Sequence, residues 1–150
     1  MLATAPAARG ILYDQPQVVA DAPKLLRQHG IDDRVRIESG SFFEAVPAGG
    51  DLYVMKLIIH DWPDEEAVTI LRNVRNAAGA GGTLLLVEQV IPNHDREFLG
   101  KWVDLEMLLC LAARERTAAE YRDLLGRAGF ELTRVVQTAS PFSFVEAKPS

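Results

Sequence analysis

The stretch Asp51-Leu-Tyr-Val-Met-Lys-Leu-Ile-Ile-His-Asp-Trp62 decides the fold of this chain. Its seven apolar residues are interrupted only by Lys56, and they predict a strand that is buried on both faces of a parallel sheet. Pro63 and three consecutive acids then open a stretch whose apolar residues recur at helical spacing. A buried strand therefore brings His60 to its carboxyl end, which in open α/β sheets is the edge where ligands bind.

Strand and helix patterns alternate along the chain and predict one domain over residues 1–150, with the α/β architecture of a doubly wound sheet. Strands are expected over residues 10–14, 34–38 and 83–88, helices over 18–29, 64–78, 95–111 and 117–128, and a closing strand pair over 130–137 and 142–147. Because the carboxyl ends of parallel strands share one edge, we expect Asp14, His60 and Glu88 to converge there as a binding site requires.

Composition and charge restrict the classes of function. The chain is 48% hydrophobic and 25% charged, as soluble globular proteins are. A net charge of −5 with no basic run argues against nucleic-acid binding, which relies on clustered Lys and Arg. The single cysteine, Cys110, excludes an internal disulfide and a multi-cysteine metal site, and its apolar neighbours predict that it is buried. No apolar run or signal pattern indicates a membrane or an export route, so we expect a cytoplasmic protein without a metal centre.

Three motifs in order carry a family resemblance: His60-Asp-Trp62 after the strand, Val87-Glu-Gln-Val-Ile-Pro92, and Arg114-Glu-Arg-Thr117. Together they resemble the S-adenosylmethionine-dependent small-molecule O-methyltransferases related to the caffeate and hydroxyindole enzymes. The resemblance covers residues 10–147. It implies a Rossmann-like class I methyltransferase fold and transfer of a methyl group from S-adenosylmethionine to a hydroxyl of a small aromatic or polyketide-like acceptor.

The resemblance assigns the catalytic residues. It implies that His60 is the general base for the acceptor hydroxyl, and that Glu88 and Glu115 orient this base. The chemistry is sound, because an imidazole with an ordinary pKa near ~6.5 can remove a phenolic proton while the new bond forms. Alternative interpretations are a purely structural histidine at a strand end, and an exposed Glu115 that stabilises the following helix through its dipole.

The resemblance also implies which residues bind the cofactor. Asp14 would hold the ribose hydroxyls, as a carboxylate does in dinucleotide folds, or it is a turn-forming residue. Ser41 and Phe42 match the adenine-binding segment, although the family usually has Asp where Ser41 stands. Lys56 would contact the cofactor or extend its stem along the sheet, and Trp62 would pack beside the adenine or in the core.

The acceptor pocket is expected on the long helix of residues 95–111. There, Trp102, Asp104 and Met107 correspond to the pocket wall of the family. For Met107, packing in the hydrophobic core is the alternative, whereas Asp104 on so apolar a helix needs a specific partner.

Two parts of the family pattern are missing from this sequence. The family has a glycine-rich loop after a first central strand, and only Gly10 occurs in the thirteen residues before Asp14. That strand lies between the strands ending at Asp14 and Lys56, so we expect an incomplete sheet with unpaired edges. The N-terminal dimerisation domain of the family is also absent.

Three hypotheses therefore remain. The chain is the carboxyl-terminal catalytic portion of a methyltransferase, completed by self-association or by another chain that supplies a strand. Alternatively, it is a non-catalytic remnant that pairs with a full-length relative. The third, a nicotinamide-dependent reductase, lacks support because the sequence has no Gly-x-Gly-x-x-Gly motif.

Overall fold

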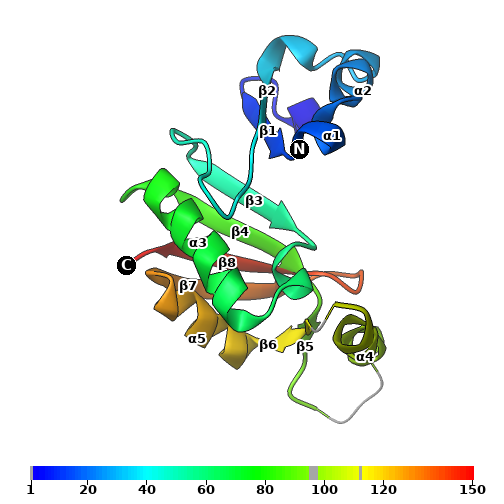
Figure 1. Cartoon of the computed structure of the whole chain (residues 1–150), viewed down its shortest axis with the longest axis vertical. Coiled ribbons are helices and arrows are strands. Elements are labelled where there is room, and N and C mark those ends of the chain that lie inside the picture. Colours follow the sequence, from blue (N-terminus) through cyan, green and yellow to red (C-terminus); the bar gives the residue numbers. More distant parts are fainter. Residues whose placement is uncertain (1, 95–97, 112) are drawn as a thin grey trace.

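The computed structural model describes residues 2–94, 98–111 and 113–150, and the strands within these ranges form three separate sheets (Figure 1). The strands are β1 (Gly10–Asp14), β2 (Val35–Ser39), β3 (Leu52–Lys56), β4 (Thr83–Glu88), β5 (Val90–Ile91), β6 (Arg116–Thr117), β7 (Phe130–Gln137) and β8 (Ser143–Pro149). The helices are α1 (Pro16–Val19), α2 (Ala22–Gln28), α3 (Asp64–Ala78), α4 (Leu99–Leu111) and α5 (Ala118–Arg127), with 3₁₀ turns η1 (Leu2–Thr4), η2 (Asp32–Arg34) and η3 (Ile59–Asp61).

The main sheet has the strand order β3-β4-β8-β7. β3 and β4 run parallel, whereas β8 is antiparallel to both of its neighbours, so the expected closing pair is confirmed. α3 and α5 lie on the same face of this sheet (Figure 1). The strand β4 alternates between buried and half-buried residues because successive side chains point to opposite faces. Its buried side chains and those of β8 form the core with α3 and α5; examples are Leu84, Leu86, Val145, Ala147, Ile70, Leu71, Leu124 and Leu125.

The other face of the main sheet is only partly covered. Leu52, Val54, Val136 and Phe144 share this face by the strand registers, and they are between 39% and 45% exposed. The prediction that the organising strand is buried on both faces is therefore wrong. The apolar run of that strand also ends earlier than expected, at Lys56, because the chain leaves the sheet in a turn.

A gap in the hydrogen-bonded ladders separates β1 from β3. β1 pairs in parallel with β2, and among the described residues no ladder joins this pair to the main sheet. Figure 1 shows β1 and β2 together with α1 and α2, set apart from β3. Ile11 and Leu12 on β1 are 37% and 38% exposed. The expected open edges are confirmed, and each leaves backbone groups that can pair with a further strand.

A single guanidinium fixes the N-terminal residues. Arg34 donates to the carbonyl oxygens of Leu2, Ala5, Pro6 and Ala8 at 3.1 to 3.2 Å. Free carbonyls in succession occur where a helical segment ends, and a basic side chain is a usual partner for them. The segment before β1 is thereby held against the start of β2.

Two helical regions differ from the sequence predictions, and so does the burial of one side chain. Residues 16–28 form two short helices, each with a proline in its first turn, where a single helix was predicted over residues 18–29. α4 begins at Leu99, and residues 95–97 of the expected helix lie outside the described residues. Cys110 is exposed, so its predicted burial is wrong. Within the described ranges, no helix has the length and apolarity that a membrane span needs.

The start of α5 agrees with the sequence prediction of a capping box. The Thr117 hydroxyl accepts from the backbone N–H of Glu120, and the Glu120 carboxylate accepts from the backbone N–H of Thr117. This reciprocal pair is the predicted capping box, which fixes the point where β6 turns into the helix.

Since no ladder crosses the gap, we predict that the two sheets open independently. Ile70→Ala, in the core of the main sheet, should lower the protection of its amides against hydrogen exchange by about 2–5 kcal/mol. The amides of β1 and β2 should keep their protection. The matched variant Val19→Ala, in the buried part of α1, should show the reverse pattern. An equal loss in both sheets for either variant would contradict this prediction.

Candidate active site

The turn that carries His60 is held by a buried acid. After β3, Leu57 adopts a left-handed backbone with φ of 53° and donates its N–H to the carbonyl oxygen of Val87 on β4. The next two residues, Ile58 and Ile59, donate their N–H groups to Glu88 Oε1 at 3.3 and 3.0 Å. Glu88 ends β4 and is fully buried. Its carboxylate therefore satisfies the backbone of the turn η3 and fixes it against the sheet.

The imidazole of His60 lies against a second buried acid. Its Nδ1 is 2.8 Å from Oε1 of Glu115, and the two residues are 7% and 2% exposed. Nδ1 carries the proton in the neutral ring, because a carboxylate can only accept. Nε2, the other ring nitrogen, is 3.3 Å from Oδ1 of the half-buried Asp61. The alternative of an exposed Glu115 acting on a helix dipole is excluded by this burial.

Glu115 is itself held by α4. Its backbone N–H donates to Oδ1 of Asp104 at 2.8 Å. This contact supplies the partner that an acid on so apolar a helix requires. Two consecutive hydrogen bonds thus connect Asp104 on α4 to Glu115, and Glu115 to the His60 ring in the turn η3.

Three groups that lie far apart in sequence meet here, as expected from the motifs. One ring nitrogen of His60 and one oxygen each of Glu88 and Glu115 lie within 4.8 Å of one another. Glu88 contacts the turn's backbone through its hydrogen bonds rather than the ring. The oxygens Glu88 Oε2 and Glu115 Oε2 are buried and have no hydrogen-bond partner among the described residues. Two carboxylate oxygens beside the imidazole can therefore still accept a hydrogen bond.

Burial and charge move the proton affinities of this cluster. Burial opposes the charged form of His60, but the hydrogen bond to Glu115 and the nearby charges of Glu88, Glu115 and Asp61 raise its pKa overall. Burial raises the pKa of Glu88 to about 7, although His60 and the two backbone N–H groups oppose this shift. The site therefore holds protons near neutral pH, where a base must accept and release them.

The predicted adenine-side residues gather around Trp62. The Trp62 ring centroid lies 6.2 Å from Phe42 and 4.7 Å from Phe43, both edge to face. Asn73 of α3 donates to the carbonyl oxygen of Phe42 at 2.9 Å, and Ser41 Oγ accepts from the Phe43 backbone N–H at 3.3 Å. The aromatic cluster is thus tied to α3, and its member Trp62 follows His60 by two residues.

Asp14 belongs to the separate β1–β2 sheet. It is half-buried, and its Oδ1 accepts from the backbone N–H of Gln15 at 2.7 Å. Its neighbour Tyr13 donates its hydroxyl to the carbonyl oxygen of Ala45 at 2.8 Å. A side chain at Gly40 would overlap this hydroxyl, so the glycine lets the loop of residues 40–45 approach β1 closely.

The remaining predicted residues lie away from the imidazole's hydrogen bonds. Lys56 is exposed, and its Nζ lies 5.3 Å from the ring centroid of Phe142 in a cation–π contact. On α4, Trp102 is 64% exposed and Met107 is half-buried. Of the three residues predicted on that helix, Asp104 alone bonds directly to a member of the cluster.

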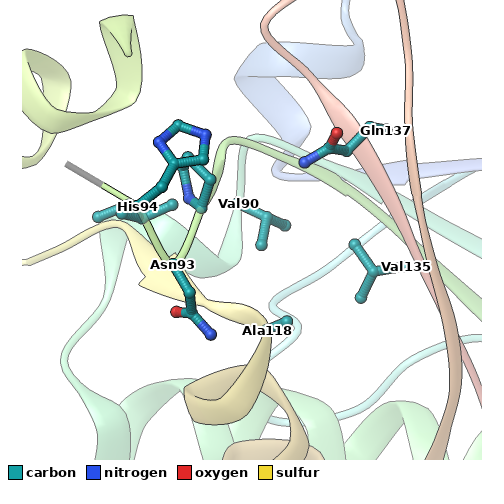
Figure 2. Close-up of a pocket in the computed structure, with 8 residues that line it drawn as sticks. Val90, Asn93, His94, Ala118, Val135 and Gln137 are labelled. Carbon is teal, nitrogen blue, oxygen red and sulfur yellow. The ribbon is translucent and has the colours of Figure 1, made fainter. Parts of the chain in front are cut away.

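A hollow of about 510 Å³ lies beside β5 and β7 (Figure 2). Val90, Ile91, Pro92, Asn93, His94, Ala118, Val135 and Gln137 line it. This lining includes no residue predicted for catalysis, cofactor or acceptor. The hollow is therefore separate from the buried His60 cluster.

Sequence reasoning missed Arg116, whose side chain is fully buried. It donates to Asp64 and to the carbonyl oxygens of Ile59 and Trp62. The signal was present in the alternation of Arg114-Glu-Arg116, which in an extended segment directs successive side chains to opposite sides.

Residues 1–131 match the O-methyltransferase domain family. This chain belongs to that family. As an O-methyltransferase domain, it is 50% identical over 149 residues to the phenazine O-methyltransferase of Lysobacter antibioticus, covering 99% of this chain and 44% of the relative. It is 39% identical over 142 residues to the acetylserotonin O-methyltransferase of Mus musculus, covering 91% and 37%. The domain therefore spans less than half the length of these curated relatives, and the match falls in their carboxyl-terminal part.

Solved structures agree with this assignment. An O-methyltransferase from neocarzinostatin biosynthesis, in complex with S-adenosylmethionine and 2-hydroxy-5-methyl naphthoic acid, superposes with a TM-score of 0.90 at 32% identity. The match covers 99% of this O-methyltransferase domain and 44% of that chain. The expected methyltransferase fold is thus confirmed.

The raised pKa of Glu88 predicts a pH-dependent effect of neutralising it. The folded-state value of about 7 lies above the ordinary 4.5, so the stabilisation from this proton is full below pH 4.5 and is lost as pH rises through 7. Glu88→Gln should therefore gain stability relative to the original chain between pH 5 and pH 8, on the order of 1–3 kcal/mol. Urea unfolding at both pH values measures this gain.

Glu66→Gln, which changes an exposed acid of α3, is the control for Glu88→Gln. It should show no gain with pH. A difference between Glu88→Gln and the original chain that stays the same at both pH values would contradict the assignment of a raised pKa to Glu88.

Proposed function

We propose that this chain is the catalytic portion of an S-adenosylmethionine-dependent O-methyltransferase, with His60 as the general base. The observation that carries the proposal is the 2.8 Å contact between His60 Nδ1 and the buried Glu115. It fixes the tautomer in which Nε2 has the free lone pair, and it stabilises the imidazolium that forms when Nε2 takes a proton. A purely structural histidine would not require a buried carboxylate on one nitrogen and a second acid nearby.

The acceptor hydroxyl would approach Nε2. Asp61, which lies 3.3 Å from this nitrogen and whose side chain is 38% exposed, would have to turn toward solvent. Nε2 would remove the hydroxyl proton and so make the acceptor oxygen nucleophilic toward a methyl donor. Bound S-adenosylmethionine supplies the activated methyl group. Glu115 keeps the ring oriented throughout, and the proton later leaves His60 to solvent.

The described residues fit part of this cofactor. Asp14 is half-buried with one carboxylate oxygen available to ribose hydroxyls, and the cluster of Phe42, Phe43 and Trp62 provides apolar rings suited to adenine. Ser41 and Lys56 would contribute polar contacts at the rim. The glycine-rich loop that the resemblance implies for cofactor binding has no counterpart in this sequence. We propose that a segment outside these 150 residues supplies it.

We propose a small aromatic hydroxyl compound as the acceptor class. The neocarzinostatin enzyme was solved with a naphthoic acid, and the Lysobacter relative is named for a phenazine. In this chain, α4 would supply the acceptor wall, with Trp102 and Met107 as apolar contacts. Asp104 would act indirectly, because its carboxylate holds the backbone of Glu115.

We further propose that residues 1–150 become one complete domain when a strand fills the gap between β1 and β3. Support comes from the exposed apolar residues on both edges and from the length of the relatives, which extend well beyond this match. The exposed residues Leu99, Trp102, Leu105, Leu108 and Leu109 of α4 give the added segment, or a second copy, a further surface to cover.

The catalytic test combines this chain with the part of the Lysobacter phenazine enzyme that precedes the match. The two pieces should form a complex that binds S-adenosylmethionine in calorimetric titration and methylates a phenolic acceptor. His60→Ala should lower turnover by about 10²–10⁴-fold and leave cofactor affinity unchanged. His94→Ala, which changes a histidine of the hollow in Figure 2, should keep full turnover. Unchanged turnover in His60→Ala would falsify the base assignment.

The pH dependence of the same complex gives an independent check. The base acts in its neutral form, and the surroundings of His60 raise its pKa above the ordinary value of 6.5. Turnover at saturating substrate should therefore rise with pH through a midpoint above 6.5 and then level off. A rate that is flat from pH 6 to pH 9 would argue that His60 does not act as the base.

Strand insertion is tested with a proline at the open edge. Leu57 pairs with β4, so by alternation the backbone N–H of Val54 points into the gap. Val54→Pro should therefore prevent assembly in sizing experiments without removing a β3–β4 hydrogen bond. Val136→Pro, at the far side of the sheet, should leave assembly intact. Assembly without cofactor binding or turnover would favour the non-catalytic remnant instead.

A further inference from the structure

The guanidinium of Arg116 hydrogen-bonds to the backbone on both sides of His60. Nη1 donates to the carbonyl oxygen of Ile59, the residue before the histidine, at 3.0 Å. Nη2 donates to the carbonyl oxygen of Trp62, two residues after it, at 2.9 Å. Since the planar group presents its donors in a fixed fork, these contacts set the path of the backbone across the 3₁₀ turn η3.

The same guanidinium is anchored by an acid at the start of α3. Nη2 and Nε of Arg116 lie 2.7 and 3.1 Å from Oδ1 of Asp64, and Arg114 reaches Oδ2 of this carboxylate at 3.2 Å. Burial opposes the charged form of Asp64, but the two arginines outweigh it and lower the pKa of the carboxyl. Asp64 therefore remains charged across the neutral range and keeps the fork in one orientation.

Arg116 directly follows Glu115, the residue that bonds the His60 ring. One short segment thus holds the imidazole through the Glu115 carboxylate and the backbone on either side of the imidazole through the Arg116 guanidinium. A buried arginine is costly unless its donors are well satisfied. Most hydrogen bonds of Arg116 go to the histidine's turn and to Asp64, and a longer one reaches the carbonyl oxygen of Arg114 at 3.4 Å. This concentration on one turn indicates a specific task.

We propose that Arg116, fixed by Asp64, is the positioning residue that holds the His60 imidazole in register with Glu115. The inference rests on His60 being the reactive group in the proposed function, but it concerns a contact that exists without cofactor or acceptor. Arg116 touches neither of them in this assignment, and it acts only through the turn. The charged groups that face the imidazole are Glu115, Glu88 and Asp61.

The test measures the His60 ring by NMR in the full 150-residue chain. Arg116→Lys keeps the positive charge but loses the fork. The hydrogen bond to Glu115 should weaken, the His60 pKa should fall toward 6.5, and the Nδ1 proton should exchange faster with water. Asp64→Glu keeps the negative charge and displaces the anchor, and it should shift the same signals in the same direction.

Arg75→Lys is the matched control. Arg75 also binds backbone carbonyls, those of Gly79, Gly129 and Ser150, but at the other end of α3. This variant should lower the thermal midpoint while the His60 pKa and the Nδ1 proton stay unchanged. If Arg116→Lys fails to fold, Asp64→Glu decides alone. An unchanged His60 pKa in the folded Arg116→Lys or Asp64→Glu variant would overturn the proposal and leave Arg116 a purely structural role.

The outcome is separable from that of the proposed function. Loss of the Glu115 contact in these variants together with full turnover in His60→Ala would support the positioning role and reject the methyl-transfer role of the ring. An unchanged Glu115 contact in these variants together with lost turnover in His60→Ala would keep His60 as the base and reject the positioning role of Arg116.

Discussion

Glu88 holds the candidate site together by accepting two backbone hydrogen bonds from the turn that bears the histidine. The cost of burying a carboxylate is offset here because its partners are N–H groups that the turn would otherwise leave unsatisfied. The same burial raises the pKa of Glu88 to about 7, so this acid exchanges its proton near neutral pH. The acid at the end of β4 thus fixes the turn η3 and also contributes to the raised pKa of the His60 ring.

Much of this arrangement could be predicted from the sequence, because it depends on local patterns. The apolar run of β4, the capping box at Thr117 and the final strand pair each follow from periodicity or turn chemistry within a few residues. The meeting of His60, Glu88 and Glu115 could also be predicted, since a family resemblance records contacts that spacing alone does not give.

Other features depend on neighbours that no local pattern reveals. The apolar residues of β3 predict burial on both faces, yet Leu52 and Val54 are exposed because one face of the main sheet is only partly covered. The side chain of Lys56 lies over the ring of Phe142, eighty-six positions away in the sequence, and no local pattern predicts this contact. Arg116 donates to backbone carbonyl oxygens, which every residue carries, so the sequence does not reveal which turn this arginine holds.

The exposed thiol of Cys110 has a practical consequence. It is the one cysteine in the chain, and it lies on α4 among the apolar residues that we assign to an interface. A thiol-specific fluorophore would therefore attach at a single known point, without mutagenesis. Its emission colour would report the polarity around α4 continuously, so that engagement of this helix by another polypeptide could be followed in real time.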